Sequence, residues 1–463
     1  MFNDAESTSF NIPSESEVII TNNSGNPDRN GLKHKVIVPT AETARRFLKK
    51  PQCPKRVSIT MVQVIVLGLM LLLLILCCIL IETWWSSNRD KLAKNLDENL
   101  PSHINPKPLT ARDEEYHKRM INDVNSQPNV TWKAVFNKFA SRYETVFGGH
   151  DVFRPSYTQL AFSINRWTQE QLFAETEVHL KELTTTKIQL PETFDTRIKW
   201  PLCSSVHKVQ NQGGCGSCWA MVTASVISDR MCIHSNGSLQ SQTSAQDLIS
   251  CCPECGGCTG TDWALLAFVH WKEVGLVTGG GFGSFDGCKP YKHAPNCGSP
   301  CSLESYGKER HHAIKCDRSC QSLYDVTYEN DLHKAKRAYW IKPNGMTRGL
   351  YPVTDKRINA TVSKSSYEEL IKKEIFLNGP VLACFMAYEE FQHYKSGIYS
   401  SRTSKYTKPL YGHCAKLIGW GSEHGTPYWQ YMNTWGSSWG ENGFFRVRLS
   451  ELPEEVAAGL PML

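Results

Sequence analysis

The segment QGGCGSCWA at residues 212–220 runs into CWAMVTASVISDRMCIH at residues 218–234. In the second segment the apolar residues Trp219, Val222, Val226 and Ile227 recur at helical spacing, which predicts a helix with one buried face. The glycines of the first segment permit a tight turn, so residue 218, a cysteine, falls in the first turn of that helix. Unpaired N–H groups and the helix dipole favour a thiolate at that position, which makes this cysteine a candidate nucleophile.

A thiolate nucleophile needs a proton partner and a group that orients this partner. YGHCAKLIGWG at residues 411–421 supplies His413, and MNTWGSSWGENGFF at residues 432–445 supplies Asn433. We expect His413 to form an ion pair with Cys218 and later to protonate the leaving amine. Asn433 would hold the imidazole by a hydrogen bond.

Two further side chains complete the predicted site. Gln212 would donate its side-chain amide to the developing oxyanion, together with the backbone N–H of Cys218. Trp435 follows Asn433 by two positions and would shield the amide–imidazole hydrogen bond from water.

The segments around these residues predict the fold class. PVLACFMAY (380–388), AKLIGWG (415–421) and PYWQYMNTW (427–435) are short, rich in β-branched or aromatic residues, and bounded by Gly or Pro, as strands are. A helix-bearing half followed by a strand-rich half predicts an α+β protein with a cleft between the halves.

Composition limits the class of protein. The 463 residues are 41% hydrophobic and 21% charged, which excludes a disordered or fibrous chain and a polytopic membrane protein. The net charge of +6 equals the six cations between Arg45 and Arg56, so the excess concerns membrane orientation and does not indicate nucleic-acid binding.

One segment is typical of a membrane span. Val57 to Ile81 carries no charge over 25 residues, enough for a helix to cross a bilayer, and it lies too far from the N-terminus for a cleaved signal peptide. The basic flank predicts a signal anchor with residues 1–56 in the cytoplasm as a disordered tail. A role of this flank in binding anionic lipid headgroups is the alternative.

The rest of the chain would then be lumenal or extracellular. A proline-punctuated stalk is expected at residues 82–112, and three sequons offer glycosylation sites at Asn129, Asn236 and Asn359. Glu114 to Phe139 is predicted to be helical, with Trp132, Val135, Phe136 and Phe139 on one apolar face. A linker rich in Thr and Glu follows, and a new block begins at Leu190.

These motifs resemble the papain family of cysteine peptidases, most closely its cathepsin B group, over roughly residues 113–463. INDVN (121–125) and TWKAVFNKF (131–139) are similar to the propeptide, and LPETFDTRIKWP (190–201) to the start of the mature enzyme. SDRMCIH, AQDLISCC, GCKPY and VAAGLP also match in order.

The resemblance implies a two-lobed fold with a helical left lobe, a β-barrel-like right lobe and the active-site cleft between them. It implies a zymogen whose propeptide, residues 113–189, runs through the cleft and is removed near Leu190, which leaves a peptidase of residues 190–463. Because the anchor precedes this cut, activation would release the enzyme from the membrane. Peptide or protein substrates, cystatin-like inhibitors and no cofactor or metal are expected, in a type II membrane precursor that becomes lysosomal or secreted.

The cysteines agree with a lumenal location, since thirteen of the eighteen lie between Cys203 and Cys320. Sequence alone leaves their connectivity open. The family resemblance implies the pairs Cys203–Cys232, Cys215–Cys258, Cys251–Cys316, Cys252–Cys255, Cys288–Cys320 and Cys297–Cys301. A zinc site in CCPECGGC (251–258) is the alternative.

Two cysteines remain at positions that, by resemblance, line the pocket for the second substrate residue. Cys384 and Cys414 form either a seventh bridge across this pocket or two buried thiols. The same resemblance assigns Gly260, Thr261 and Trp263 to substrate binding.

Three departures from the cathepsin B pattern concern specificity. That group carries a His-His pair after its first loop cysteine, which binds the substrate carboxylate; here Cys297 is followed by Gly-Ser-Pro-Cys, and His311-His312 lies near the far end of the loop. His311 and His312 are interpreted as solvated surface residues, and we predict an endopeptidase with weak or absent dipeptidyl carboxypeptidase activity.

The other two departures narrow the pocket. A substrate-facing glycine of the family is Thr261, whose branched side chain crowds the path of the peptide. The C-terminal acidic element is shortened to LSELPEEVAAGLP (449–461), and we do not expect Glu454 or Glu455 to replace its acid. A catalytically silent peptide-binding or adhesion module is the alternative function, but retention of Gln212 and the other three catalytic candidates favours an enzyme.

Overall fold

The computed structural model describes residues 111–137, 166–213, 215–261, 263–293, 315–343, 366–405 and 407–463, with Ile358, Val362 and six residues of the first unit. The chain divides into two compact units, residues 1–94 and 95–463. In the first unit Leu69, Met70, Leu72, Leu73, Leu76 and Cys77 are helical and exposed. The remainder of the segment predicted to span a membrane lies outside the described residues. No helix in the described part of the chain has the length and hydrophobicity that a membrane crossing requires.

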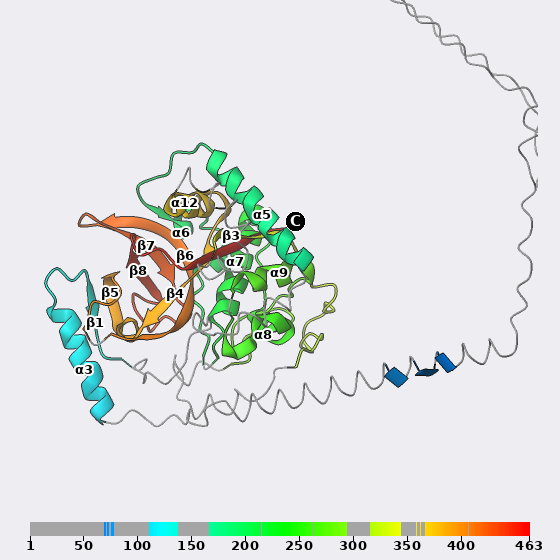
Figure 1. Cartoon of the computed structure of the whole chain (residues 1–463), viewed down its shortest axis with the longest axis horizontal. Helices are drawn as coiled ribbons and strands as arrows, with labels where there is room; N and C mark the ends of the chain where they lie inside the picture. Colours follow the sequence, from blue (N-terminus) through cyan, green and yellow to red (C-terminus); the bar gives the residue numbers. More distant parts are fainter. Residues whose placement is uncertain are drawn as a thin grey trace, which may run out of the picture. The chain divides into compact units, whose positions relative to one another are not determined.

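In the second unit most helices come before most strands along the chain, as the sequence predicts (Figure 1). Its α-helices are α3 (Ala111–Ser126), α5 (Arg166–Thr185), α6 (Thr196–Lys199), α7 (Cys218–His234), α8 (Ala245–Cys251), α9 (Leu265–Glu273) and α12 (Tyr367–Asn378). Single 3-10 turns are η1 (Ser204–His207), η2 (Pro253–Cys255), η3 (Gly257–Thr259) and η6 (Glu389–His393).

The described strands form one sheet, and most of them come from the second half of the chain. They are β1 (Trp132–Ala134), β2 (Phe194–Asp195), β3 (Ala335–Lys342), β4 (Val381–Tyr388), β5 (Tyr394–Tyr399), β6 (Pro409–Glu423), β7 (Thr426–Met432), β8 (Phe444–Arg448) and β9 (Glu455–Pro461). Their order is β1-β5-β8-β7-β6-β4-β9-β3, with β2 paired to β6, and β5–β8 is the parallel pair among antiparallel ones. The three strands predicted from sequence are β4, β6 and β7, and this prediction is confirmed.

Helix α7 has the predicted bounds, but its environment differs from the prediction. Every residue from Cys218 to Cys232 is buried, because α7 packs against β6 and β9 on one side and against α8 and α9 on others. The polar residues that sequence would place on a solvent face are paired inside: Asp229 with Lys416 at 2.8 Å, and Arg230 with Glu374 at 2.8 Å. A helix surrounded by protein needs no exposed face when its charged side chains have partners of opposite charge.

The helix predicted from Glu114 to Phe139 is correct only in its first half. Helix α3 ends before Pro128, and Asn129 adopts a left-handed conformation (φ 63°), which turns the chain into β1. Strand β1 pairs with β5, and the ring of Trp132 lies against Tyr394. Phe139 lies outside the described residues.

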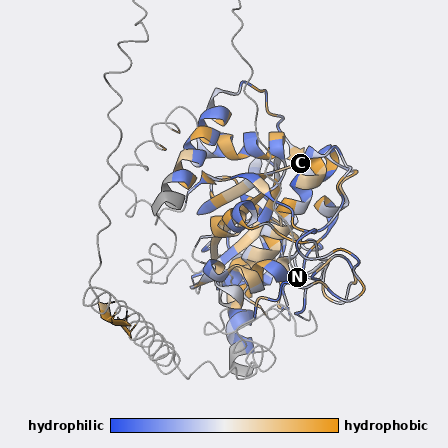
Figure 2. Ribbon diagram, turned by 90° about the vertical axis from the view of Figure 1, so that its right-hand side faces the viewer, coloured by the Kyte–Doolittle hydropathy of each residue, from blue (hydrophilic) through white to orange (hydrophobic). Residues whose placement is uncertain are grey.

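The segment predicted to be a linker contains helix α5. Its sequence, RWTQEQLFAETEVHLKELTT, is mostly polar, but Leu172, Phe173, Leu180 and Leu183 are buried in the main hydrophobic core. Figure 2 shows that the helices of the domain carry both hydrophilic and hydrophobic residues, as helices with one buried face do. These apolar residues are few among polar ones, so the sequence of α5 indicates a helix with a buried face only weakly.

Candidate active site

The first turn of α7 holds Cys218, which is fully buried and forms no disulfide. The turn before it is fixed by the Cys215–Cys258 disulfide and by the Gly216 N–H, which donates to the Cys258 carbonyl at 3.0 Å. Gly213 takes a left-handed conformation (φ 58°), as predicted for this turn, and residue 214 lies outside the described residues. The nucleophile is therefore presented by a rigid turn at the positive end of a helix.

Strand β6 carries His413, and the residue after it contacts the nucleophile. The backbone N–H of Cys414, the next residue, donates to the Cys218 sulfur at 3.3 Å. The His413 Nε2 lies 2.8 Å from the Asn433 Oδ1, an oxygen that can only accept, so Nε2 carries the proton in the neutral ring. The Thr434 N–H donates to the same Oδ1 at 2.8 Å and fixes the amide orientation. This arrangement leaves Nδ1 as the nitrogen able to exchange a proton with the thiol.

Burial shapes the acidity of the imidazole. His413 is fully buried, and this burial lowers its pKa to about 4, whereas the hydrogen bond with Asn433 acts in the raising direction. In this buried environment the imidazole is therefore neutral above about pH 4, and its charged form is disfavoured.

Gln212 is held by the residue that follows Asn433. Its backbone N–H donates to the Thr434 carbonyl at 2.8 Å, and the Thr434 hydroxyl donates to the Gln212 Oε1 at 2.6 Å. The Gln212 Nε2 donates to the Cys215 carbonyl at 2.9 Å, in the turn that presents the nucleophile. The residues that follow β7 therefore position both the Asn433 amide, which orients the imidazole, and the Gln212 amide, which is expected to face the oxyanion. Sequence reasoning missed Thr434, although its position between Asn433 and Trp435 was a usable signal.

Aromatic rings enclose the imidazole. The Trp435 ring lies 4.8 Å from the His413 ring, and the Phe385 ring meets it edge-on at 5.7 Å. Trp435 is itself packed against Trp439 at 5.0 Å. These rings exclude water from the side of the amide–imidazole bond, which is the role predicted for Trp435. Sequence reasoning missed Tyr411. Burial raises the pKa of its hydroxyl, and a negative charge on the nearby Cys218 would raise this pKa further.

The two extra cysteines occupy directly opposed positions on β4 and β6. Cys384 and Cys414 are fully buried and bonded, with Cα atoms 4.0 Å apart. Of the two alternatives left open by the sequence, the structure contains the bridge. Its Cys414 end also supplies the N–H that reaches the nucleophile, so the bridge is attached directly to the catalytic centre.

A buried carboxylate lies beside this bridge. Glu455 is opposite Cys384 in the β4–β9 register, but its oxygens accept hydrogen bonds from the N–H groups of Ala264 and Leu265 at 3.2 Å each, and from the Trp340 indole at 2.8 Å. The carboxylate therefore caps the start of α9. This agrees with the expectation that Glu455 does not replace the acid of the cathepsin B pattern.

The remaining pocket candidates lie in the loop before α9. Gly260 has a left-handed φ of 100°, and Thr261 is buried with its hydroxyl donating to the Trp263 carbonyl at 3.1 Å. Trp263 belongs to the main core, where its ring meets Trp340 edge-on at 6.3 Å. The structure therefore gives Trp263 a packing role.

The structure also locates the other cysteines and the sequons. Bonded pairs are present at Cys203–Cys232, Cys215–Cys258, Cys251–Cys316, Cys252–Cys255 and Cys288–Cys320, whereas Cys297–Cys301 lies outside the described residues. Bonded cysteines of CCPECGGC offer no thiolates, which removes the zinc alternative for that segment. Asn129 and Asn236 are exposed in left-handed turns, and Asn359, His311 and His312 are outside the described part of the chain.

A helix-borne thiol, an amide-oriented imidazole and a fixed carboxamide beside them constitute the machinery of a cysteine peptidase. Residues 190–456 match the model of the papain family cysteine proteases, and the chain belongs to this family.

Its relatives include cathepsin B-like proteins. Identity is 37% over 301 residues with cathepsin B-like cysteine proteinase 1 of Ostertagia ostertagi, covering 64% of this chain and 80% of the relative. It is 33% over 359 residues with cathepsin B-like cysteine proteinase 6 of Caenorhabditis elegans, covering 74% and 83%. Among solved structures, procathepsin B S9 of Trypanosoma congolense is similar with a TM-score of 0.53 and 27% identity, over 75% of this chain and 98% of that one. The chain is therefore a cysteine peptidase with a papain-like α+β fold.

Proposed function

We propose that this chain is a cathepsin B-like cysteine endopeptidase with little or no dipeptidyl carboxypeptidase activity, made as a membrane-anchored zymogen. The observation that carries the proposal is the arrangement of Cys218, His413, Asn433 and Gln212 around the start of α7.

Each residue has a role in the reaction. In the opened site the imidazole Nδ1 takes the thiol proton, and the thiolate of Cys218 attacks the substrate carbonyl carbon. The negative oxygen that forms is stabilised by the Cys218 backbone N–H and the Gln212 Nε2. His413 then gives its proton to the leaving amine, and water hydrolyses the thioester, which returns the thiol.

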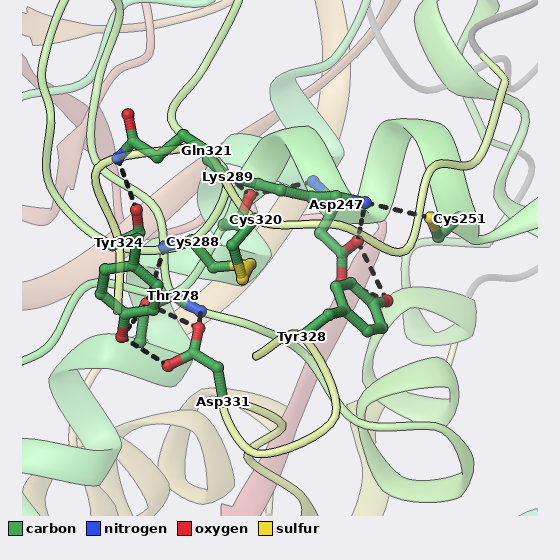
Figure 3. Close-up of a disulfide and its surroundings, with 12 residues drawn as sticks. Asp247, Cys251, Thr278, Cys288, Lys289, Cys320, Gln321, Tyr324, Tyr328 and Asp331 are labelled. Atoms are coloured by element: carbon green, nitrogen blue, oxygen red, sulfur yellow. Dashed lines mark hydrogen bonds and ion pairs between the residues drawn. A yellow bond between two sulfur atoms is a disulfide. The ribbon is translucent and has the colours of Figure 1, made fainter. Parts of the chain in front are cut away.

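The preference for internal cleavage rests on the loop between Cys288 and Cys320. Figure 3 shows the base of this loop, where the disulfide lies near Lys289, whose ammonium contacts the Asp247 carboxylate at 2.9 Å, and Tyr328, whose hydroxyl donates to the same carboxylate. A base built of a disulfide and a buried ion pair fixes where the loop leaves the fold. With the His-His pair at the far end of the loop, we infer that the substrate carboxylate is not recognised as it is in the cathepsin B group.

Two peptides of identical sequence test this inference, one with a free C-terminal carboxylate and one amidated. We expect equal kcat/KM and internal products for both peptides, identified by mass spectrometry. Release of C-terminal dipeptides from the free acid alone, abolished in Cys218→Ala, would show that exopeptidase action is retained.

The Cys384–Cys414 bridge is proposed to narrow the pocket for the second substrate residue. Replacing both cysteines by alanine removes two buried sulfur atoms and enlarges this pocket. The kcat/KM for a reporter peptide with Phe as its second substrate residue, relative to one with Val there, is therefore expected to rise about 10-fold. The matched control replaces Cys203 and Cys232, a bridge in a separate small cluster, and should leave this ratio unchanged. Equal shifts in both variants would mean that the bridge affects stability alone.

The zymogen proposal is supported by the contacts of α3 and β1 with η6 and β5. The His117 Nδ1 and the His393 Nε2 are 3.0 Å apart in a buried pair, and the Tyr116 hydroxyl donates to Glu389 at 2.8 Å. The Phe136 ring stacks on His393, and the Lys118 ammonium lies 5.9 Å from the centre of the Phe136 ring. These contacts hold the segment before the expected activation cut on the peptidase domain.

Acid is expected to loosen this contact. Burial, and then the neighbouring His117, lower the pKa of His393 to about 3, so the docked state favours neutral rings and loses stability as pH falls from about 6.5 towards 3. Nearby Glu389 opposes this effect, because burial raises its pKa, and Glu390 is likewise raised. In the Cys218→Ala precursor, hydrogen exchange of α3 should accelerate over this pH range, whereas in a His117→Phe variant it should depend less on pH. An equal pH dependence in both would contradict the role of the histidine pair.

We also propose that Val57–Ile81 anchors the precursor, with the peptidase domain lumenal or extracellular and the active enzyme lysosomal or secreted. The uncharged segment, its basic flank and the disulfides support this orientation. Alkaline carbonate extraction should leave the precursor with the membrane pellet and move the activated enzyme to the supernatant. A precursor that is extracted by carbonate would contradict the anchor.

A further inference from the structure

We propose that α5 is a permanent part of the peptidase domain and remains bound when the inhibitory α3–β1 segment leaves. The mature enzyme would then contain residues 166–185 together with residues 190–463, joined by the chain or held by contact alone. The inference rests on the proposed zymogen activation and changes its expected product, because the resemblance predicts removal of everything before Leu190.

The first support is the edge of the sheet. Strand β3 is the last in the strand order, and Figure 1 shows α5 beside it. The outward Trp340 N–H donates to the Thr176 hydroxyl at 3.2 Å, and the Ala338 N–H lies 3.4 Å from a Glu175 carboxylate oxygen. Side chains of α5 thus take the place of a neighbouring strand, and loss of α5 would expose an unpaired edge.

The second support is a buried carboxylate that α5 helps to satisfy. Glu374 of α12 is fully buried and accepts from Arg230, from the Tyr339 hydroxyl at 2.7 Å and from Asn378 at 3.0 Å. Its other neighbour is the His179 Nε2 of α5 at 2.7 Å, and the His179 ring stacks on Tyr339 at 3.6 Å. Removing α5 takes one partner from a charge network in the interior, which is costly.

The third support is apolar packing and the end of the helix. The four buried apolar residues of α5 belong to the main core of the peptidase domain, and Phe173 lies 5.3 Å from Trp340, ring to ring. At the other end, the buried Lys373 ammonium of α12 donates to the Leu183 carbonyl at 3.2 Å, in the last turn of α5. A cation at this position complements the negative end of the helix dipole.

Ion pairs close the rim of the same interface. Lys272 of α9 contacts Glu175 at 2.6 Å, and Arg337 of β3 contacts Glu182 at 2.7 Å. Side chains from α9, β3 and α12 of the peptidase domain therefore all contact α5 in the described part of the structure.

The two pro-region contacts respond differently to acid. The α3 contact contains neutral rings that acid charges, whereas the α5 contact contains Glu374, whose pKa the His179 and Arg230 charges hold well below its usual range against burial. Tyr339, Asn378 and the rim acids Glu175 and Glu182 also face this contact. Acidification therefore weakens the α3 contact while the carboxylate at the centre of the α5 contact remains charged.

A recovery experiment tests the proposal without relying on enzyme activity. The full-length precursor with a C-terminal affinity tag is solubilised in detergent, treated with pepsin at acidic pH, captured under native conditions and then denatured for peptide mapping. We expect residues 166–185 in equal amount to the domain and residues 111–137 depleted. Loss of residues 166–185 together with 111–137 would overturn the proposal. An aliquot of the same sample is treated with an epoxysuccinyl probe before denaturation. Absence of the probe from Cys218 would instead count against the proposed function.

Matched histidine variants give a second readout on the activated enzyme. His179→Ala is expected to lower its Tm by about 10 °C, whereas His117→Ala, in the departing helix, should leave it within about 1 °C of wild type. If His179→Ala fails to accumulate, Thr176→Val removes only the acceptor for the β3 edge and should lower the Tm by about 3 °C. An activated His179→Ala or Thr176→Val enzyme with the Tm of wild type would show that α5 had gone.

Discussion

Replacing Cys218 by alanine is expected to reduce kcat/KM for peptide hydrolysis by at least about 10⁴-fold. The side chain supplies the only group that bonds covalently to the substrate, and the helix dipole and Gln212 remain but have no nucleophile to assist. The Cys218 sulfur accepts a hydrogen bond from the Cys414 N–H, which the substitution removes. The measurement is hydrolysis of a fluorogenic peptide by activated enzyme.

The control for this variant is its structure. Cys218→Ala should retain the disulfides and unfold within about 2 °C of the wild-type precursor, because alanine fits the first turn of a helix. Activity above the background of a mock preparation, in a correctly folded variant, would show that another residue performs the reaction.

Replacing Glu374 by alanine is expected to cause the largest loss of stability, about 3–5 kcal/mol in the free energy of unfolding. Its carboxylate is fully buried and contacts Arg230, itself fully buried, at 2.8 Å. Without the carboxylate, the guanidinium stays in the interior with hydrogen bonds to Tyr339 and to the backbone carbonyls of Gly379, Pro380 and Gly459, but without a counter-charge. Urea unfolding of the precursor measures the change.

Glu369, on the same helix, is the matched control. It pairs with Lys373 at 2.8 Å but is 43% exposed, so Glu369→Ala should cost less than about 1 kcal/mol. Glu374→Gln keeps hydrogen-bonding capacity without the charge and should fall between the two. Equal unfolding midpoints for Glu374→Ala and Glu369→Ala would contradict the importance of the buried network.

The sequence predicts candidate catalytic residues that the fold brings together, because the proposed reaction requires local sequence patterns. The glycine turn before Cys218, the strand that carries His413 and the tryptophan after Asn433 are each readable in a short window, and the fold brings them together. The predicted helix has the observed bounds for the same reason. Register between β4 and β6 then decides what the sequence left open, since it opposes Cys384 to Cys414.

The failures concern interactions that no short window contains. Trp132 shows helical spacing, but pairing with β5 across the fold makes its segment a strand. Helix α5 reads as a polar linker because His179 and Thr176 are polar, and their partners lie far along the chain, at Glu374 and Trp340. In both cases tertiary contacts outweigh the local signal.

The burial of His413 affects the charge of the imidazole in the precursor. Burial holds the His413 ring neutral above about pH 4, and uncovering the site restores the solvation that an imidazolium needs. While the ring is buried, its charged imidazolium form is therefore disfavoured.

Covalent labelling with an epoxysuccinyl probe, followed by peptide mapping, tests the central claim most directly. The activated enzyme is predicted to carry one adduct, on the peptide that contains Cys218, and the closed precursor to label far more slowly. No adduct on the activated enzyme, or equal labelling of the Cys218→Ala variant, would contradict a cysteine peptidase with this nucleophile.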